Sequence, residues 1–185
     1  MKKYLCQNLW GVLLATILVS CGKDDKVVPY DPNYMAGNYE GTCVIDYGTK
    51  SQTDNSFFAQ FVMDSSNGTT LSGLFGDERT RDEDGLGLIG NVQLTNFENH
   101  GQATFHMSNI VVKYNELIPK FISKQTEAFV VKSAVLTLAC EKEGRFDPSK
   151  QEMRFVYKGK LEIEGTQSNQ KFSNSISYSF VLKKI

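Results

Sequence analysis

The chain has 185 residues, 41% hydrophobic and 22% charged, which suits one domain with its own core and excludes two domains of ordinary size. Its 20 basic and 21 acidic residues give a formal net charge of −1, and this near balance argues against a nucleic-acid partner. Four prolines and 15 glycines do not indicate a disordered chain.

The first twenty residues have the proportions of a secretory signal peptide. Lys2 and Lys3 give this segment a positive start, and residues 9–19 are mostly apolar. An apolar run of about eleven residues is roughly 16 Å long as a helix, too short for a hydrocarbon core of ~30 Å. We therefore expect residues 1–20 to be a cleaved signal and not a permanent membrane span.

The end of this segment resembles the lipobox of bacterial lipoproteins. Leu18, Val19 and Ser20 precede Cys21, so an apolar residue stands three positions before a cysteine and a small residue stands just before it. The resemblance implies cleavage between Ser20 and Cys21 and lipidation of the Cys21 thiol, which would make palmitate-type acyl chains the membrane anchor. An ordinary signal peptide with a chance cysteine is the alternative. Each buried CH₂ contributes about 0.8 kcal/mol, so two or three chains anchor a protein for long times.

The polar residues after Cys21 resemble a second targeting signal. Residues 22–26 read Gly-Lys-Asp-Asp-Lys, which is similar to the export signal of Bacteroidetes lipoproteins that reach the cell surface. The resemblance implies the outer membrane, with the domain exposed outside the cell; a merely solvated spacer is the alternative. With Pro29 and Pro32, residues 21–35 are expected to be a lipidated, flexible and extended tether.

From residue 36 onward, apolar and polar residues alternate with the period of a β-strand. Such alternation is typical of an antiparallel sheet with one buried face and one solvent-exposed face. The clearest case is residues 152–164, and the pattern predicts eight strands in all, at 39–47, 57–63, 69–75, 86–94, 103–112, 129–140, 152–164 and 175–183.

Eight strands without crossover helices predict an all-β fold, an antiparallel meander closed as a barrel, with a β-sandwich as the alternative. Turn residues separate several strands, at 66–68, 99–101 and 144–148. Residues 115–127 depart from the alternation, because their apolar residues are spaced as on one helical face. We expect a short helix or ordered loop there, with Pro119 in its first turn.

The domain as a whole resembles the calycin-like, or lipocalin-like, β-barrel lipoproteins. Residues 36–42 (Ala-Gly-Asn-Tyr-Glu-Gly-Thr) open the first strand, and residues 144–147 and 156–161 are similar to the closing strands of such domains. Tyr39 stands where lipocalins carry tryptophan, and the last strand carries Lys183 and Lys184 instead of an arginine. The resemblance covers residues 36–185 and implies a barrel domain there, without implying an activity.

Two cysteines remain in the domain, Cys43 and Cys140. Each shares a strand face with apolar residues, so both are predicted to point toward the core. In an oxidising envelope the pair is a disulfide candidate, and two buried free thiols are the alternative.

No residue set predicts catalysis, a cofactor or a metal site. The acidic loop at 77–85 lacks the third spaced carboxylate and the distal glutamate of a calcium loop, so a solvated loop explains it better. His100 and His106 lack the spacing of a zinc site. The chain has neither a Gly-x-Ser-x-Gly motif nor a phosphate loop. We therefore expect a protein that is not an enzyme.

Aromatic side chains on the apolar strand faces are the remaining candidates for a site. A small eight-stranded barrel is either filled by its own side chains or holds one small ligand. The first expectation is a surface lipoprotein that binds a small apolar or sugar ligand inside the barrel. The alternative is a non-enzymatic scaffold or interaction subunit with a solid core, which docks an envelope protein through loops such as residues 117–122. The candidate ligand-lining residues are Phe61, Phe105, Phe155, Tyr157, Tyr178 and Phe180.

Overall fold

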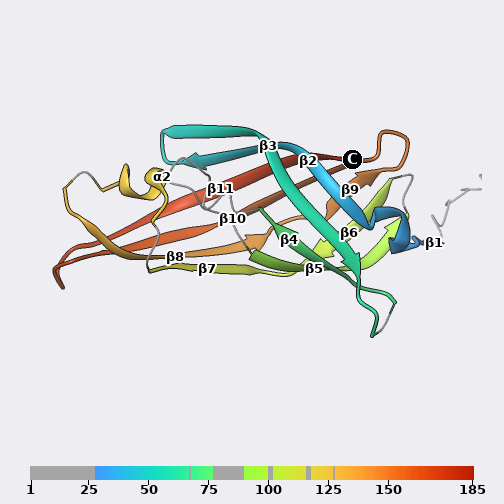
Figure 1. The fold of residues 1–185 in the computed structure, drawn as a ribbon, viewed down its shortest axis with the longest axis horizontal. Coiled ribbons are helices and arrows are strands. Elements are labelled where there is room, and N and C mark those ends of the chain that lie inside the picture. Colours follow the sequence, from blue (N-terminus) through green and yellow to red (C-terminus); the bar gives the residue numbers. More distant parts are fainter. Residues whose placement is uncertain (1–27, 67, 77–89, 100–101, 116–117, 127) are drawn as a thin grey trace, which may run out of the picture.

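The computed structural model describes residues 28–66, 68–76, 90–99, 102–115, 118–126 and 128–185 (Figure 1). Within them the protein is all-β, with 67% of residues in strands and one short α-helix. The predicted signal peptide, the lipobox with Ser20 and Cys21, the acidic loop at 77–85, His100 and Leu117 lie outside the described residues.

One hydrogen-bonded antiparallel sheet contains all the described strands. The helical elements are a 3₁₀ helix, η1 (Pro32–Met35), and α2 (Lys120–Ser123), and in the described parts of the chain no helix is both long and apolar enough to cross a membrane. The strands are β1 (Val28–Pro29), β2 (Gly37–Tyr47), β3 (Lys50–Met63), β4 (Leu71–Phe75), β5 (Gly90–Asn99), β6 (Ala103–Met107), β7 (Ile110–Tyr114), β8 (Val131–Cys140), β9 (Gly144–Asp147), β10 (Glu152–Gly165) and β11 (Lys171–Lys184).

The sheet is a meander whose ends meet. Strands β2, β3, β4, β5 and β6 pair in chain order, β6 pairs with β9, and β9, β10 and β11 pair in turn before β11 returns to β2. These eight strands form a ring that is not evenly arranged about an axis. The other half of β10 pairs with β8, and β8 pairs with β7. β6 and β7 follow each other in the chain after a short break, as do β8 and β9, so each pair of strands resembles one long strand that is interrupted once. The predicted all-β, antiparallel character of the fold is confirmed.

Burial follows the predicted alternation along the two longest strands. In β10 the side chains of Met153, Phe155, Tyr157, Leu161 and Ile163 are buried, and the residues between them are exposed or half-buried. In β11 the buried set is Ile176, Tyr178, Phe180 and Leu182. The two strands pair along their whole length, from Glu152↔Lys183 to Glu164↔Lys171, so their apolar faces form one wall of the core.

The prediction of a turn at residues 144–148 is wrong for residues 144–147, and only residue 148 lies in a turn. Gly144 to Asp147 form β9, which is paired with β6 on one side and with β10 on the other. Gly144 serves packing, because a Cβ there would clash with the Phe105 ring. The chain turns only afterwards, where Gln151 adopts a φ of 53°.

Residues 28–35 of the expected tether contain two ordered elements, β1 and η1. β1 pairs with β5, and the Asp31 side chain accepts a hydrogen bond from the Asn33 backbone N–H at 2.9 Å, which caps η1. Pro32 suits the start of this helix, since its fixed φ is helical and it needs no N–H partner there. Met35 then lies fully buried in the core.

The short helix predicted in residues 115–127 is confirmed as α2. Pro119 directly precedes it, as its N-cap residue. Phe121 and Ile122 are buried in the core. These two apolar side chains of the expected docking loop, residues 117–122, are therefore not available to a partner.

Candidate functional site

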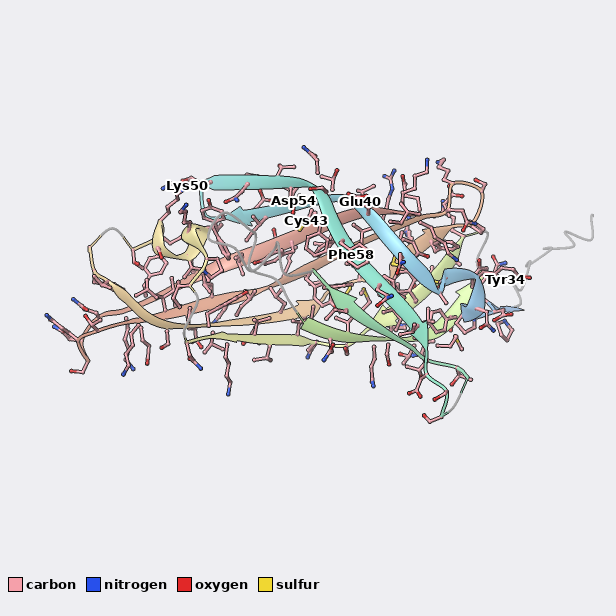
Figure 2. All side chains as sticks on the ribbon, viewed as in Figure 1. Tyr34, Glu40, Cys43, Lys50, Asp54 and Phe58 are labelled. Atoms are coloured by element: carbon pink, nitrogen blue, oxygen red, sulfur yellow. The ribbon has the colours of Figure 1, made fainter. Side chains whose placement is uncertain are left out.

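The predicted ligand-lining residues all lie in the core, and they fill it. None of the six side chains is more than 4% exposed. Phe155 and Phe180 are stacked at 4.6 Å between ring centroids, and Phe61 and Tyr39 meet edge to face at 5.5 Å. Figure 2 shows side chains occupying the space between the strands. The interior around these residues is therefore packed with the protein's own rings.

Phe75 is the centre of this aromatic packing. Its ring lies 5.3 Å from that of Phe155 and 5.4 Å from that of Phe180. Further rings contact it edge to face, those of Phe57 at 6.4 Å, Phe61 at 5.8 Å and Tyr157 at 6.2 Å. Such pairs stabilise by about 0.5–1.5 kcal/mol each beyond their burial. The alternation of β4 places Phe75 on the inner face, but sequence alone does not show that the candidate lining residues meet on it.

The buried tyrosines have polar partners inside the core. The Tyr157 hydroxyl donates to the Ser108 carbonyl oxygen at 2.8 Å, and the Tyr39 hydroxyl donates to the Met35 carbonyl oxygen at 2.8 Å. Burial raises the pKa of Tyr157 and of Tyr178, so both phenols stay protonated at neutral pH. In the described residues no buried side-chain nitrogen or oxygen lacks a hydrogen-bond partner.

Cys43 and Cys140, the candidate disulfide pair, are free thiols in the structure. Cys43 lies on β2 and Cys140 on β8, with β11 and β10 between them. Three strand spacings amount to about 14 Å, whereas disulfide-bonded cysteines have Cα atoms within about 7 Å.

The surroundings of the two thiols differ. Cys43 is fully buried and pairs with Asp54 of β3 (Figure 2). Its burial, and to a smaller extent the negative charge of Asp54, raise the pKa of the Cys43 thiol. Cys140 is only half-buried, contrary to expectation, and its Sγ donates to the Lys142 carbonyl oxygen at 3.0 Å. Burial also raises the pKa of the Cys140 thiol.

His106 lies exposed on the outer face of the sheet. Its Nε2 is 3.3 Å from the Glu143 carboxylate, and both side chains are about half exposed. In the described parts of the chain, no group of three or more His, Cys, Asp or Glu side chains is arranged to hold a metal ion.

An outer cleft opens where β8 breaks off and β9 begins, and the sequence did not predict it. Pairing with β8 reaches Tyr157 and pairing with β9 starts at Arg154, so Phe155 and Val156 of β10 lack a strand partner on that side. The cleft encloses about 990 Å³. Its lining residues are Gln102, Thr104, His106, Cys140, Glu141, Lys142, Glu143, Arg145, Arg154, Phe155, Val156 and Lys158.

The outer cleft is rich in charge. Lys158 pairs with Glu141 at 2.7 Å, and Arg154 pairs with Glu152 at 2.6 Å through its Nε. Arg145 lies directly opposite Arg154 in the register of β9 and β10. This arrangement can hold an anion by charge-assisted hydrogen bonds.

Two of the residues considered for the calycin-like resemblance, Tyr39 and Lys184, lie opposite each other where β11 pairs with β2. Lys184 pairs with Tyr39, its side chain lies over Gly37, and its Nζ donates to the Tyr34 carbonyl oxygen at 3.1 Å. Figure 2 shows Tyr34 at the same end of the molecule as β1. Lys184 thus joins the last strand to the segment that precedes the first strand of the ring.

The chain matches no family model, no curated protein and no solved structure in the comparisons with known proteins.

Proposed function

We propose that this chain is a bacterial lipoprotein held at the outer membrane by acyl chains on Cys21, with its domain exposed at the cell surface. The lipobox at residues 18–21 and the Lys-Asp-Asp sequence at 23–25 support this proposal. Residues 22–27 separate the anchor from β1 and reach at most about 20 Å when extended. The end that carries β1 and η1 would therefore face the membrane.

We further propose that the domain is a calycin-like barrel with a solid core, which acts as a non-enzymatic scaffold or interaction subunit of an envelope complex. One observation carries this choice over an interior carrier of an apolar or sugar ligand: the six expected lining residues are at most 4% exposed and pack on one another and on Phe75. A ligand inside would have to displace these rings.

The anchor is tested by metabolic labelling with radioactive palmitate in a bacterium that processes lipoproteins. Wild-type protein should incorporate label and sediment with the outer membrane, and external protease should remove it from intact cells. Cys21→Ser should lose the label, while the matched variant Cys43→Ser should keep it, because Cys43 is buried in the core. Equal labelling of Cys21→Ser and wild type would refute the anchor.

The solid core is tested by extracting the purified full-length chain with organic solvent and searching the extract by mass spectrometry. We expect the wild type to release no lipid beyond its own anchor. Phe180→Ala is the control, because it removes a ring that stacks on Phe155 and opens apolar space, and such cavities bind small apolar molecules. A stoichiometric apolar or sugar ligand in the wild type would favour the carrier instead.

A further inference from the structure

The outer cleft contains two arginines that face each other across neighbouring strands. Arg145 of β9 pairs with Arg154 of β10, and on its other side it pairs with Thr104 of β6. Side chains directly opposite in an antiparallel pair have Cβ atoms about 4.5–5.5 Å apart, and like charges in such positions are destabilising. A bound anion would relieve this repulsion.

Within the part of the chain that the structure describes, only Arg154 of the two has a carboxylate partner. Arg154 donates from Nε to Glu152 at 2.6 Å, which leaves its terminal nitrogens available, and its side chain is 63% exposed. Among the described residues, none forms an ion pair or a side-chain hydrogen bond with Arg145, which is exposed on the sheet surface. Two unfilled sets of N–H donors therefore lie side by side.

The remaining charges of the cleft strengthen this positive potential. Four basic side chains line the cleft, those of Lys142, Arg145, Arg154 and Lys158, against the two lining carboxylates and that of Glu152, which is bound to Arg154. Both lining carboxylates are already engaged, Glu141 with Lys158 at 2.7 Å and Glu143 with His106 at 3.3 Å. The cleft therefore has a local positive excess, although the whole chain has a formal net charge of −1.

We propose that Arg145 and Arg154 bind a divalent oxyanion, a sulfate or phosphate group, either free or carried by a ligand that lies in the outer cleft. The planar guanidinium fork matches the oxygen geometry of such groups, and both arginines keep N–H donors that can reach them. Val156, 39% exposed beside them, provides an apolar wall for the body of the ligand. The proposal goes beyond the interaction role above, and it depends neither on the lipid anchor nor on the solid core.

The test is titration calorimetry on the purified full-length chain in neutral detergent. Inorganic sulfate, inorganic phosphate and acetate are each added, with sodium chloride at equal ionic strength as the reference. Sulfate or phosphate should bind saturably, and acetate at least tenfold more weakly, because it carries one charge. A sulfated monosaccharide and a phosphorylated one then show which ester is preferred over its free ion.

Variants assign the binding to the two arginines. Arg145→Gln and Arg154→Gln should each weaken binding at least tenfold. Lys160→Gln removes one positive charge from an exposed position of β10 outside the cleft, and it should change the affinity less than twofold. Arg145→Lys keeps the charge without the fork and should bind with intermediate affinity. It also serves if Arg145→Gln does not fold.

Thermal unfolding gives an independent readout. Sulfate stabilises most proteins by exclusion from their surface, so the informative quantity is the difference between variants. Sulfate should raise the melting temperature of wild type and Lys160→Gln more than that of Arg145→Gln. Absence of saturable binding, equal affinity for acetate, or equal losses in Arg145→Gln and Lys160→Gln would each overturn the proposal.

Discussion

The Tyr157 hydroxyl donates a hydrogen bond to the carbonyl oxygen of Ser108 at a distance of 2.8 Å. Ser108 lies between β6 and β7, where the interrupted strand passes from one partner to the next. The Ser108 backbone N–H donates to the Gln93 carbonyl oxygen, and its hydroxyl accepts from the Gln93 N–H, both at 2.9 Å. The polar groups of the interruption are thus satisfied from β5 on one side and from β10 on the other.

We predict that Tyr157→Phe lowers the free energy of unfolding by about 1–2 kcal/mol, because the Ser108 carbonyl oxygen loses a donor in a partly buried place. Urea unfolding followed by circular dichroism measures the change. Tyr34→Phe is the matched control, since the Tyr34 side chain is 64% exposed, and it should cost less than about 0.5 kcal/mol. Equal stability of Tyr157→Phe and wild type would contradict this role.

Gly159 allows a close approach between β10 and β8. It pairs with Leu138, and a Cβ at position 159 would clash with the Thr137 carbonyl oxygen. We expect Gly159→Ala to lower the free energy of unfolding by at least about 3 kcal/mol, because two paired backbones would have to separate. The measurement is the denaturant midpoint, or the yield of folded protein if the variant does not fold.

A second glycine provides the control for this prediction. Gly68 has a φ of 63° and no atom near the place of a Cβ, so Gly68→Ala should cost only the left-handed backbone penalty of about 1–2 kcal/mol. Losses of the same size in the two variants would show that the backbone approach at Gly159 is not special.

Sequence periodicity predicted the long strands because their pattern is continuous. β10 alternates from Met153 to Ile163, so its inner face was evident from residue types alone. β9 has only four residues and begins with glycine, and the following Pro148 made the segment resemble a turn. Its strand conformation is imposed by pairing with β6 and β10, which no local pattern reveals.

The candidate site was predicted only in part, for a related reason. Alternation correctly placed Phe155 and Phe180 inside the sheet, but it does not show whether a closed sheet is hollow. That depends on whether rings from distant strands meet, as they do on Phe75 of β4. The outer cleft depends on the break between β8 and β9 and on the register that sets Arg145 opposite Arg154, and residue types alone reveal neither.

The free thiols predict a distinct pattern of alkylation. Thiolates are the reactive form, and burial raises the pKa of both thiols, so native protein should react slowly with iodoacetamide at pH 8. Cys140 is half-buried and Cys43 fully buried, so Cys140 should react at least tenfold faster. Mass spectrometry of proteolytic fragments separates the two sites from the other cysteines.

Denaturation without reductant should then expose both thiols to full alkylation, with Cys140→Ser leaving only Cys43 reactive in the domain. If neither cysteine reacted until a reductant was added, the two would be disulfide-bonded, and the strand order that separates them by β10 and β11 would be wrong.

Asp147 predicts a dependence of stability on pH. Its Oδ1 accepts from the Ser149 hydroxyl at 2.6 Å and from the Ser149 N–H at 2.9 Å, where the chain turns between β9 and β10. The hydroxyl is the main cause that lowers the pKa of this carboxyl from its usual 3.8 to about 2. A lowered pKa in the folded state means that the carboxylate stabilises the fold above its usual pKa, and that this contribution is lost as the pH falls through about 2.

Asp147→Asn should therefore melt at a lower temperature than wild type at pH 7, and the difference should shrink between about pH 4 and pH 2, where the wild-type carboxylate becomes protonated. Melting curves across this range measure the effect. Asp46→Asn, an exposed aspartate of β2 without such hydrogen bonds among the described residues, should follow wild type throughout. A difference that stays constant down to pH 2 would mean that Asp147 acts through its shape and not through its charge.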